Sequence, residues 1–268
     1  MNPAIKSKEY LIYLTFVFSI GSSILLLYFN PELFQILGRE DHIAEYGTAV
    51  LLGCVSVILF LVFLRIRGEY KFLSVLFLIT SILFFLGMGE EVSWGQRIVG
   101  FGTPEDLAAI NDQDEVNFHN INKYFFDSLL LHGILFLCLI IIVLRLLKFR
   151  TFINIPLPSA FVTLSALVVT MYAGHYFYWS YWALVIGMGT IGLHILYGIL
   201  NKDYILTVMA AISLFIYYYL PKLLIKLSEL LVQRNSINEY RELFIALIFV
   251  WIASGLYKNY KNVASAVK

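Results

Sequence analysis

The sequence predicts an all-α fold, a polytopic transmembrane helical bundle of about eight spans that forms a single integral-membrane domain over residues 1–268. Three observations predict it. The chain is 60% hydrophobic and only 14% charged, whereas a soluble domain carries about 25% charged residues. Uninterrupted apolar runs long enough to cross a bilayer recur along the whole chain. The chain has six prolines and no polar linker that would separate two domains.

Each apolar run predicts one span, because a helix crosses the hydrocarbon core with about 20 residues at a rise of about 1.5 Å each. The predicted spans are residues 9–29, 46–66, 70–89, 127–147, 157–175, 181–200, 204–221 and 241–257. The first run is too long for a signal peptide and no small-residue cleavage motif follows it, so a retained span is expected. Residues 157–200 are too long for one span and are expected to form a hairpin, with the aromatic cluster 176–182 at its turn.

The distribution of basic residues sets the expected orientation. With eight spans both termini lie on one side, and that side receives twelve basic and three acidic residues. The other side receives seven basic and fifteen acidic residues. Since cytoplasmic loops carry the excess of Lys and Arg, we expect both termini inside, in the plasma (inner) membrane. Four of the five histidines then lie toward the outer side.

The longest outer segment, residues 90–126, is expected to contain a short helix. Thr103 and Pro104, followed by Glu105 and Asp106, are typical of a helix N-terminus, which places this helix at about residues 104–110. The helix dipole explains the two acidic side chains, so no catalytic role is assigned to them.

The densest group of chemically useful side chains directly follows the third predicted span. Two adjacent carboxylates, Glu90 and Glu91, end an apolar run. Ionisable groups within or at the edge of a membrane span are functional by default. We predict both to be catalytic, as general acid or base. The candidate substrate-binding residues beside them are Ser93, Trp94, Gln96 and Arg97.

The geometry of this group depends on where the helix ends. If the helix continues past Glu91, then Glu90, Trp94 and Arg97 share one face. The alternative to a catalytic site is a solvated helix end with an ion pair between Glu90 and Arg97.

A second polar group lies at residues 111–120. Its clustered oxygens do not match an EF-hand calcium loop, because glycine is missing at the sixth position and glutamate at the twelfth. His119 lies between Asn117 and Asn120, whose amides can orient an imidazole or bind a polar headgroup. We therefore predict a catalytic role for His119 and substrate binding for both asparagines. The alternative is a capped turn that leads into the fourth span.

Two further histidines lie at a similar predicted depth. His132 is in the outer third of the fourth predicted span, and His175 is at the outer end of the fifth. Two or three histidines with a carboxylate are the usual ligand set of a catalytic zinc. We predict His119, His132 and His175 as ligands of a divalent metal such as zinc, although each histidine taken singly is more typical of a hydrogen-bonded interior residue.

Three other polar positions receive structural interpretations. His42 lies at the start of the second predicted span, and Glu242 lies beside Arg241 at the start of the eighth, so both favour solvated helix starts. His194 lies in the inner half of the sixth span, among glycines that allow close helix packing, and is excluded from the outer site.

Paired glutamates on one helix, with separate histidines on later helices, resemble the type II CAAX prenyl endopeptidase family. That family has Glu-Glu-x-x-x-Arg, then Phe-x-x-x-His, then His-x-x-x-Asn. Glu90 and Glu91 match the pair, and the resemblance implies catalysis by glutamate and histidine within a membrane. Where the family has arginine, phenylalanine and asparagine, this chain has Gly95, Met171 and Gly198, so the resemblance is limited to the glutamates.

Three functions fit these features. The first is a membrane-embedded hydrolase or transferase that acts on a lipid, lipid-linked or membrane-anchored substrate at the outer face, with a Glu/His site and a possible metal. The second is a multi-span binding or assembly subunit whose outer segment contacts a protein partner. The third is an ion- or proton-coupled transporter, which the few charges at mid-membrane depth disfavour. The net charge of +1 gives no reason to expect a nucleic-acid partner.

Overall fold

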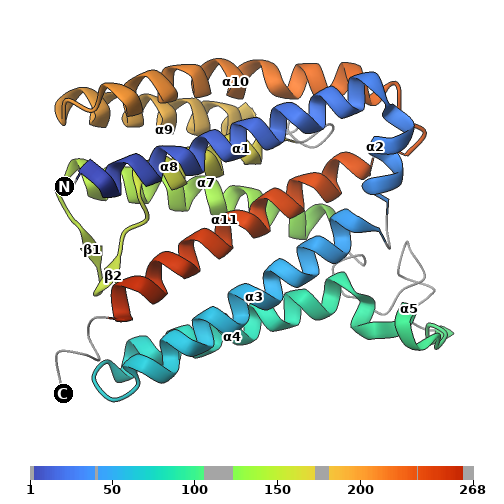
Figure 1. The fold of residues 1–268 in the computed structure, drawn as a ribbon, viewed down its shortest axis with the longest axis horizontal. Helices are drawn as coiled ribbons and strands as arrows, with labels where there is room; N and C mark the ends of the chain where they lie inside the picture. Colours follow the sequence, from blue (N-terminus) through green and yellow to red (C-terminus); the bar gives the residue numbers. More distant parts are fainter. Residues whose placement is uncertain (1–2, 40–41, 106–122, 173–180, 234, 262–268) are drawn as a thin grey trace. The chain divides into compact units, whose positions relative to one another are not determined.

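The structure is a computed structural model, and it describes residues 3–39, 42–105, 123–172, 181–233 and 235–261. Over these residues the chain is almost entirely helical, with one small two-stranded hairpin (Figure 1). In chain order the elements are α1 (Pro3–Phe29), α2 (Pro31–Leu37), α3 (Ile43–Ile66), α4 (Lys71–Glu91), the 3-10 turn η1 (Ser93–Gly95), α5 (Gln96–Val99), α7 (Lys123–Leu146), β1 (Thr151–Phe152), β2 (Ile155–Pro156), α8 (Ala160–Thr170), α9 (Tyr181–Leu200), α10 (Tyr204–Ser228) and α11 (Ser236–Lys261).

Seven helices in the described part of the chain are long and apolar enough to cross a membrane, which confirms the predicted all-α, polytopic bundle. They are α1, α3, α4, α7, α9, α10 and α11. The fifth predicted span, residues 157–175, differs. Its helix α8 has 11 residues, or about 16 Å of helix, which is about half of the ~30 Å hydrocarbon core.

Burial explains the composition of α8. Every residue of α8 is buried, whereas the seven long helices bury only 28–33% of their most apolar stretch. The hydroxyls of Ser165 and Thr170 donate to carbonyls within α8, so these two polar side chains need no partner outside the helix. A helix that is apolar on all sides is stable inside a bundle, and α8 lies among α1, α9 and α10.

The chain forms two compact units. Unit 1 comprises Met1–Arg39 and Leu131–Ile248, and unit 2 comprises Glu40–Leu130 and Phe249–Lys268. Both α7 and α11 pass from one unit into the other, so the backbone connects the units through continuous helices. The single domain expected over residues 1–268 stays a prediction.

His194 joins two helices of unit 1 as a hydrogen-bonded interior residue. It is fully buried, its Nδ1 lies 2.8 Å from the carbonyl oxygen of Thr190, and its Nε2 lies 2.8 Å from the Thr163 hydroxyl. Because a carbonyl only accepts, Nδ1 donates to it, and the neutral ring then accepts from Thr163 at Nε2. The contact links the start of α8 to the second half of α9, so the two helices run antiparallel, as the expected hairpin requires.

An antiparallel hairpin of α3 and α4 forms the main body of unit 2. The hydroxyls of Ser56 and Ser81 each donate to the backbone carbonyl of the other residue, at 2.9 and 2.8 Å. Gly53 lies against the Met88 side chain, since a Cβ added to it would be 2.9 Å from the Met88 sulfur. Small residues of this kind let membrane helices approach closely.

Helix directions inside each unit agree with the predicted alternation of spans. In unit 1 the Tyr13 hydroxyl, early in α1, lies 2.7 Å from the Ser213 hydroxyl, early in α10, so these helices run parallel. In unit 2, α4 and α11 run antiparallel, because Phe77 contacts Tyr260 and Phe84 contacts Phe249. Which end of the helices faces the cytoplasm, and which membrane holds them, stay predictions.

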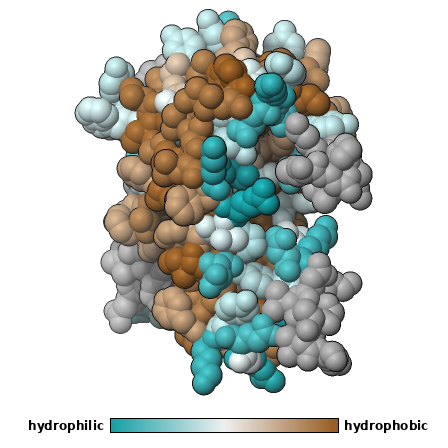
Figure 2. All heavy atoms as spheres, turned by 90° about the vertical axis from the view of Figure 1, so that its left-hand side faces the viewer, coloured by the Kyte–Doolittle hydropathy of each residue, from teal (hydrophilic) through white to brown (hydrophobic). Residues whose placement is uncertain are grey.

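Polar contacts also order the end of unit 1 at which α1 begins. Figure 2 views this end of the molecule and shows hydrophilic residues grouped beside broad hydrophobic surface. There the Arg145 guanidinium donates to the carbonyls of Pro158 at 2.8 Å and Leu157 at 3.0 Å. These bonds fix the chain just before the N-terminus of α8.

Candidate functional site at the end of α4

The backbone bends sharply where α4 ends. Val92 terminates the helix, and the three residues after it, Ser93, Trp94 and Gly95, have φ angles of 45°, 53° and 79°. Glycine adopts such angles readily, but a residue with a side chain does so at a cost of about 1–2 kcal/mol. Residues 92–95, the α4 bend, therefore hold two strained positions in succession directly after the predicted catalytic glutamates.

Side-chain contacts of Trp94 hold the bend against α4. The indole Nε1 donates to Oε1 of Glu90 at 2.8 Å. The ring covers Gly89, where an added Cβ would lie 2.7 Å from Cζ3 of the ring. Gly89 therefore allows the indole to lie directly on the helix backbone, in the position from which it reaches Glu90.

The condition for one arrangement of this group, a helix that continues past Glu91, is not met. A continuous helix that presents Glu90, Trp94 and Arg97 on one face does not form, because α4 ends at Glu91 and the left-handed bend follows. Glu90 and Trp94 still meet, since the bend folds the indole back onto the last turn of α4.

A compact loop follows the bend. The short helix α5 lies between two left-handed glycines, and Gly100 ends it by donating to the Gln96 carbonyl at 2.7 Å. The buried Gln96 side chain donates from Nε2 to the Thr103 hydroxyl at 2.7 Å, which closes residues 96–103. α5 thus supplies a short helix inside residues 90–126. Of the helix expected at about 104–110, Glu105 is helical, and residues 106–110 lie outside the described residues.

The bend gathers five of the predicted site residues. Glu90 and Glu91 are half-buried, Ser93 and Gln96 are buried, and Trp94 is partly exposed. Two adjacent carboxylates are thus partly shielded from solvent beside polar side chains. Such shielding strengthens their electrostatic action on a bound group.

Several predicted residues fall outside what the structure describes. They are Asn117, His119, Asn120, His175 and the side chain of Arg97, whose roles stay predictions. His132 is described, half-buried in α7. Among the described residues, no group of three or more His, Cys, Asp or Glu side chains could hold a metal ion. The zinc ligand set stays a prediction, because His119 and His175 are not among those residues.

The start of α11 contains buried charge that the sequence did not indicate. The exposed fraction of Arg241 is 0%, and its guanidinium lies 3.3 Å from a carboxylate oxygen of Glu242. Glu239 is buried as well. The expectation of a solvated helix start is therefore wrong here. At the neighbouring Tyr240, the Phe34 ring of α2 stacks on the tyrosine ring at 4.4 Å between centroids.

Comparisons of the chain with protein-family models, with curated proteins and with solved structures find no match. The resemblance to type II CAAX prenyl endopeptidases therefore rests on the glutamate pair alone. The function has to be inferred from the geometry of the site.

Proposed function

We propose that this protein is a membrane-embedded hydrolase or transferase. Its substrate is a lipid, a lipid-linked molecule or a membrane-anchored peptide at the membrane face where α4 ends. The observation that supports this is the α4 bend, a strained backbone maintained beside two adjacent carboxylates at the end of an apolar helix. Strained backbone clusters at active sites, because it persists only where the surrounding structure fixes it.

In this proposal Glu91 is the general base. It takes the proton from water in a hydrolase, or from an acceptor hydroxyl in a transferase. The oxygen so activated forms a bond to the acyl or phosphoryl centre of the substrate. The bond to the leaving oxygen, or to the leaving nitrogen of a peptide, breaks, and that atom takes up the proton that Glu91 removed. Glu90 is the second carboxylate of the pair, and the Trp94 indole holds it by a hydrogen bond.

The remaining predicted residues have supporting roles in the proposal. Arg97 binds an anionic substrate group, since a guanidinium pairs well with phosphate or carboxylate. Ser93, Gln96, Asn117 and Asn120 bind polar parts of the substrate. His119 either moves the proton to the leaving group or, with His132 and His175, binds a divalent metal such as zinc.

The test is the release of products from lipids around the reconstituted protein. Liposomes of phosphatidylethanolamine and phosphatidylglycerol carry isotope labels in headgroup and chains, and mass spectrometry follows free fatty acids, headgroups and exchanged lipids. Time-dependent products support the proposal. Their absence, with these lipids and with lipid-linked and lipidated-peptide substrates, favours a binding subunit or a transporter.

The bend itself is tested by Gly89→Ala. The added methyl displaces the indole and breaks its bond to Glu90, so turnover is expected to fall about 10- to 100-fold, the cost of a misplacement of about 1 Å at a catalytic group. Gly87→Ala is the control, because a Cβ there meets Leu52 at an ordinary 3.6 Å. Equal turnover in the two variants would show that the position of Trp94 has no role.

A further inference from the structure

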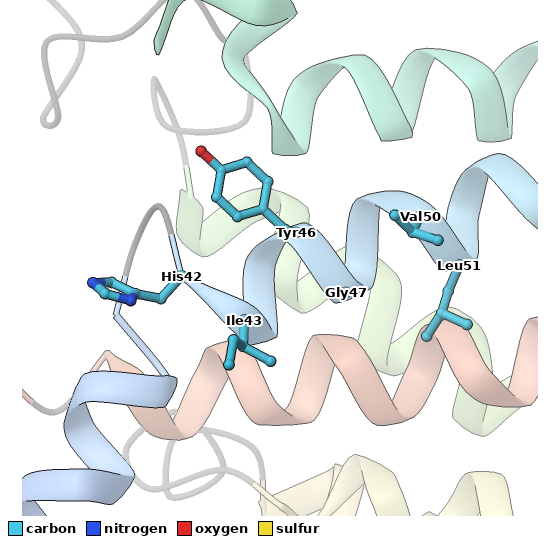
Figure 3. A pocket seen from close by; sticks show the side chains of 6 residues that line it. All are labelled: His42, Ile43, Tyr46, Gly47, Val50 and Leu51. Carbon is cyan, nitrogen blue, oxygen red and sulfur yellow. The ribbon is translucent and has the colours of Figure 1, made fainter. Parts of the chain in front are cut away.

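A shallow groove runs along the first turns of α3. Five residues of that helix and its N-cap residue line it, and its volume is about 640 Å³, within the range of about 300–1,000 Å³ that is usual for ligand pockets. Figure 3 shows the lining residues along the helix, with the aromatic rings of His42 and Tyr46 near its start and Val50 and Leu51 farther along. Among the residues that the structure describes, the lining consists of His42, Ile43, Tyr46, Gly47, Val50 and Leu51.

The chemistry of the lining changes along this α3 groove. Beyond its start it is aliphatic, and Ile43 and Val50 are 67% and 65% exposed. α3 is one of the helices that can cross a membrane, so its exposed apolar side chains meet hydrocarbon. At the start of the groove, His42 occupies the N-cap position without a side-chain capping bond, and Tyr46 adds a hydroxyl. The groove therefore has one polar end and an apolar floor.

The apolar part of the groove near Val50 lies at the height of the glutamates, and its polar end lies one to two helix turns beyond them. In the α3–α4 hairpin, Gly53 is opposite Met88 and Leu52 is opposite Gly87. The helices are antiparallel, so three residues back from Gly53 corresponds to three residues beyond Met88. With Ser56 opposite Ser81 as a third pair, Val50 is level with the last turn of α4, which ends in Glu90 and Glu91, within the same unit. In Figure 3 the Tyr46 ring points away from α3 toward the side on which the ribbon of α4 runs.

We propose that the α3 groove holds one hydrocarbon chain of a membrane lipid, with the headgroup toward His42 and Tyr46 and the junction of headgroup and chain at the height of Glu90 and Glu91. This rests on the proposed function and defines its substrate as a lipid with an acyl or isoprenoid chain. A lipid chain fits better than a protein segment, because the apolar surface continues beyond the groove through Val57 and Leu61. A chain that enters at the polar end can follow this surface into the hydrocarbon core.

Photo-crosslinking tests the groove. A phospholipid with a diazirine in its acyl chain is incorporated into liposomes with the full-length protein, and crosslinked peptides are mapped by mass spectrometry. Val50→Trp fills the groove and is expected to reduce crosslinks to residues 43–51 at least fivefold. Val57→Trp is the matched control, on the same face of α3 but outside the groove and 59% exposed.

The outcomes separate the groove from the chemistry. The Glu91→Gln variant is expected to keep the crosslinks and to lose turnover. Undiminished crosslinks in Val50→Trp, or an equal fall in Val57→Trp, would show annular lipid only and overturn the groove. Loss of crosslinks in Val50→Trp with full turnover would also overturn it, while the proposed enzyme activity stands. If the crosslinks depend on Val50 but no lipid product forms, the groove is supported and the proposed function is contradicted.

Discussion

Replacement of Glu91 by glutamine is expected to reduce lipid turnover by about 10²–10⁴-fold, the usual contribution of a general base. Glutamine has the same shape but cannot take up the proton that the attacking oxygen must lose. Because Glu91 is half-buried at the end of an intact helix, the variant is expected to fold normally. The measurement is product formation per protein molecule in liposomes, with thermal unfolding in detergent recorded in parallel.

Two companion variants make this result specific. Glu90→Gln keeps an oxygen that accepts the Trp94 indole hydrogen, so a smaller loss is expected, on the order of tenfold, as a charge-assisted bond becomes a neutral one. Glu69→Gln changes an exposed glutamate in the turn before α4 and is expected to change nothing. Full turnover in Glu91→Gln would exclude this residue as the base.

Gly187→Ala is expected to destabilise unit 1 by roughly 2–4 kcal/mol, through overpacking and the loss of one hydrogen bond. Gly187 in α9 is buried, and a Cβ added to it would overlap the Tyr217 hydroxyl of α10. That hydroxyl donates to the Ala183 carbonyl at 3.1 Å. The methyl therefore pushes α10 away from α9 and breaks the bond.

The matched control lies two residues away on the same helix. Gly189 is exposed and has no atom within 4 Å of an added Cβ, so Gly189→Ala is expected to be neutral or to stabilise by up to about 1 kcal/mol, since alanine favours helix. Thermal unfolding in detergent measures both variants. Equal stability of the two would contradict the packing of Gly187 on Tyr217.

The length of the apolar runs was enough to predict seven spans, because each crossing needs about 20 apolar residues. It was not enough for residues 157–175. There the sequence is as apolar as a span, but α8 is short and meets protein on every side. Hydropathy measures how apolar a segment is. It does not tell whether lipid or the other helices of a bundle surround that segment.

The candidate site could be predicted in composition but not in shape. A run of apolar residues that ends in Glu90 and Glu91 indicates a site at the end of a helix, whatever follows. The left-handed bend at Ser93 and Trp94 was not predictable, because residues with side chains rarely adopt positive φ and local propensity favours a continued helix. The nearest signal was the pair of glycines, Gly89 shortly before the bend and Gly95 as its last residue.

The buried charge of α11 was missed for a different reason. Charged residues at a helix start usually face solvent, so the sequence favoured a solvated helix start at Glu242, beside Arg241. The packing at this end of α11 includes α2, which is remote in sequence and contacts the neighbouring Tyr240. The signal for α2 is Asn30 before Pro31, since the Asn30 side chain caps this helix and accepts from the Leu33 amide at 3.0 Å. That signal predicts a helix, but not which surface the helix covers.

The proposed site requires that the end of α4 lies at the depth of the lipid headgroups, and a spin label measures this depth. Val99, 75% exposed on α5 beside the site, is replaced by a labelled cysteine after Cys54→Ser and Cys138→Ser remove the native thiols. Labels at Leu83, exposed in the middle of α4, and at Glu69, in the turn before α4, give the hydrocarbon and water references. Collision rates with oxygen and with a water-soluble nickel chelate are expected to place the Val99 label between the two references. A Val99 label as open to nickel as the Glu69 label would place the glutamates in bulk water and contradict a site at the membrane surface.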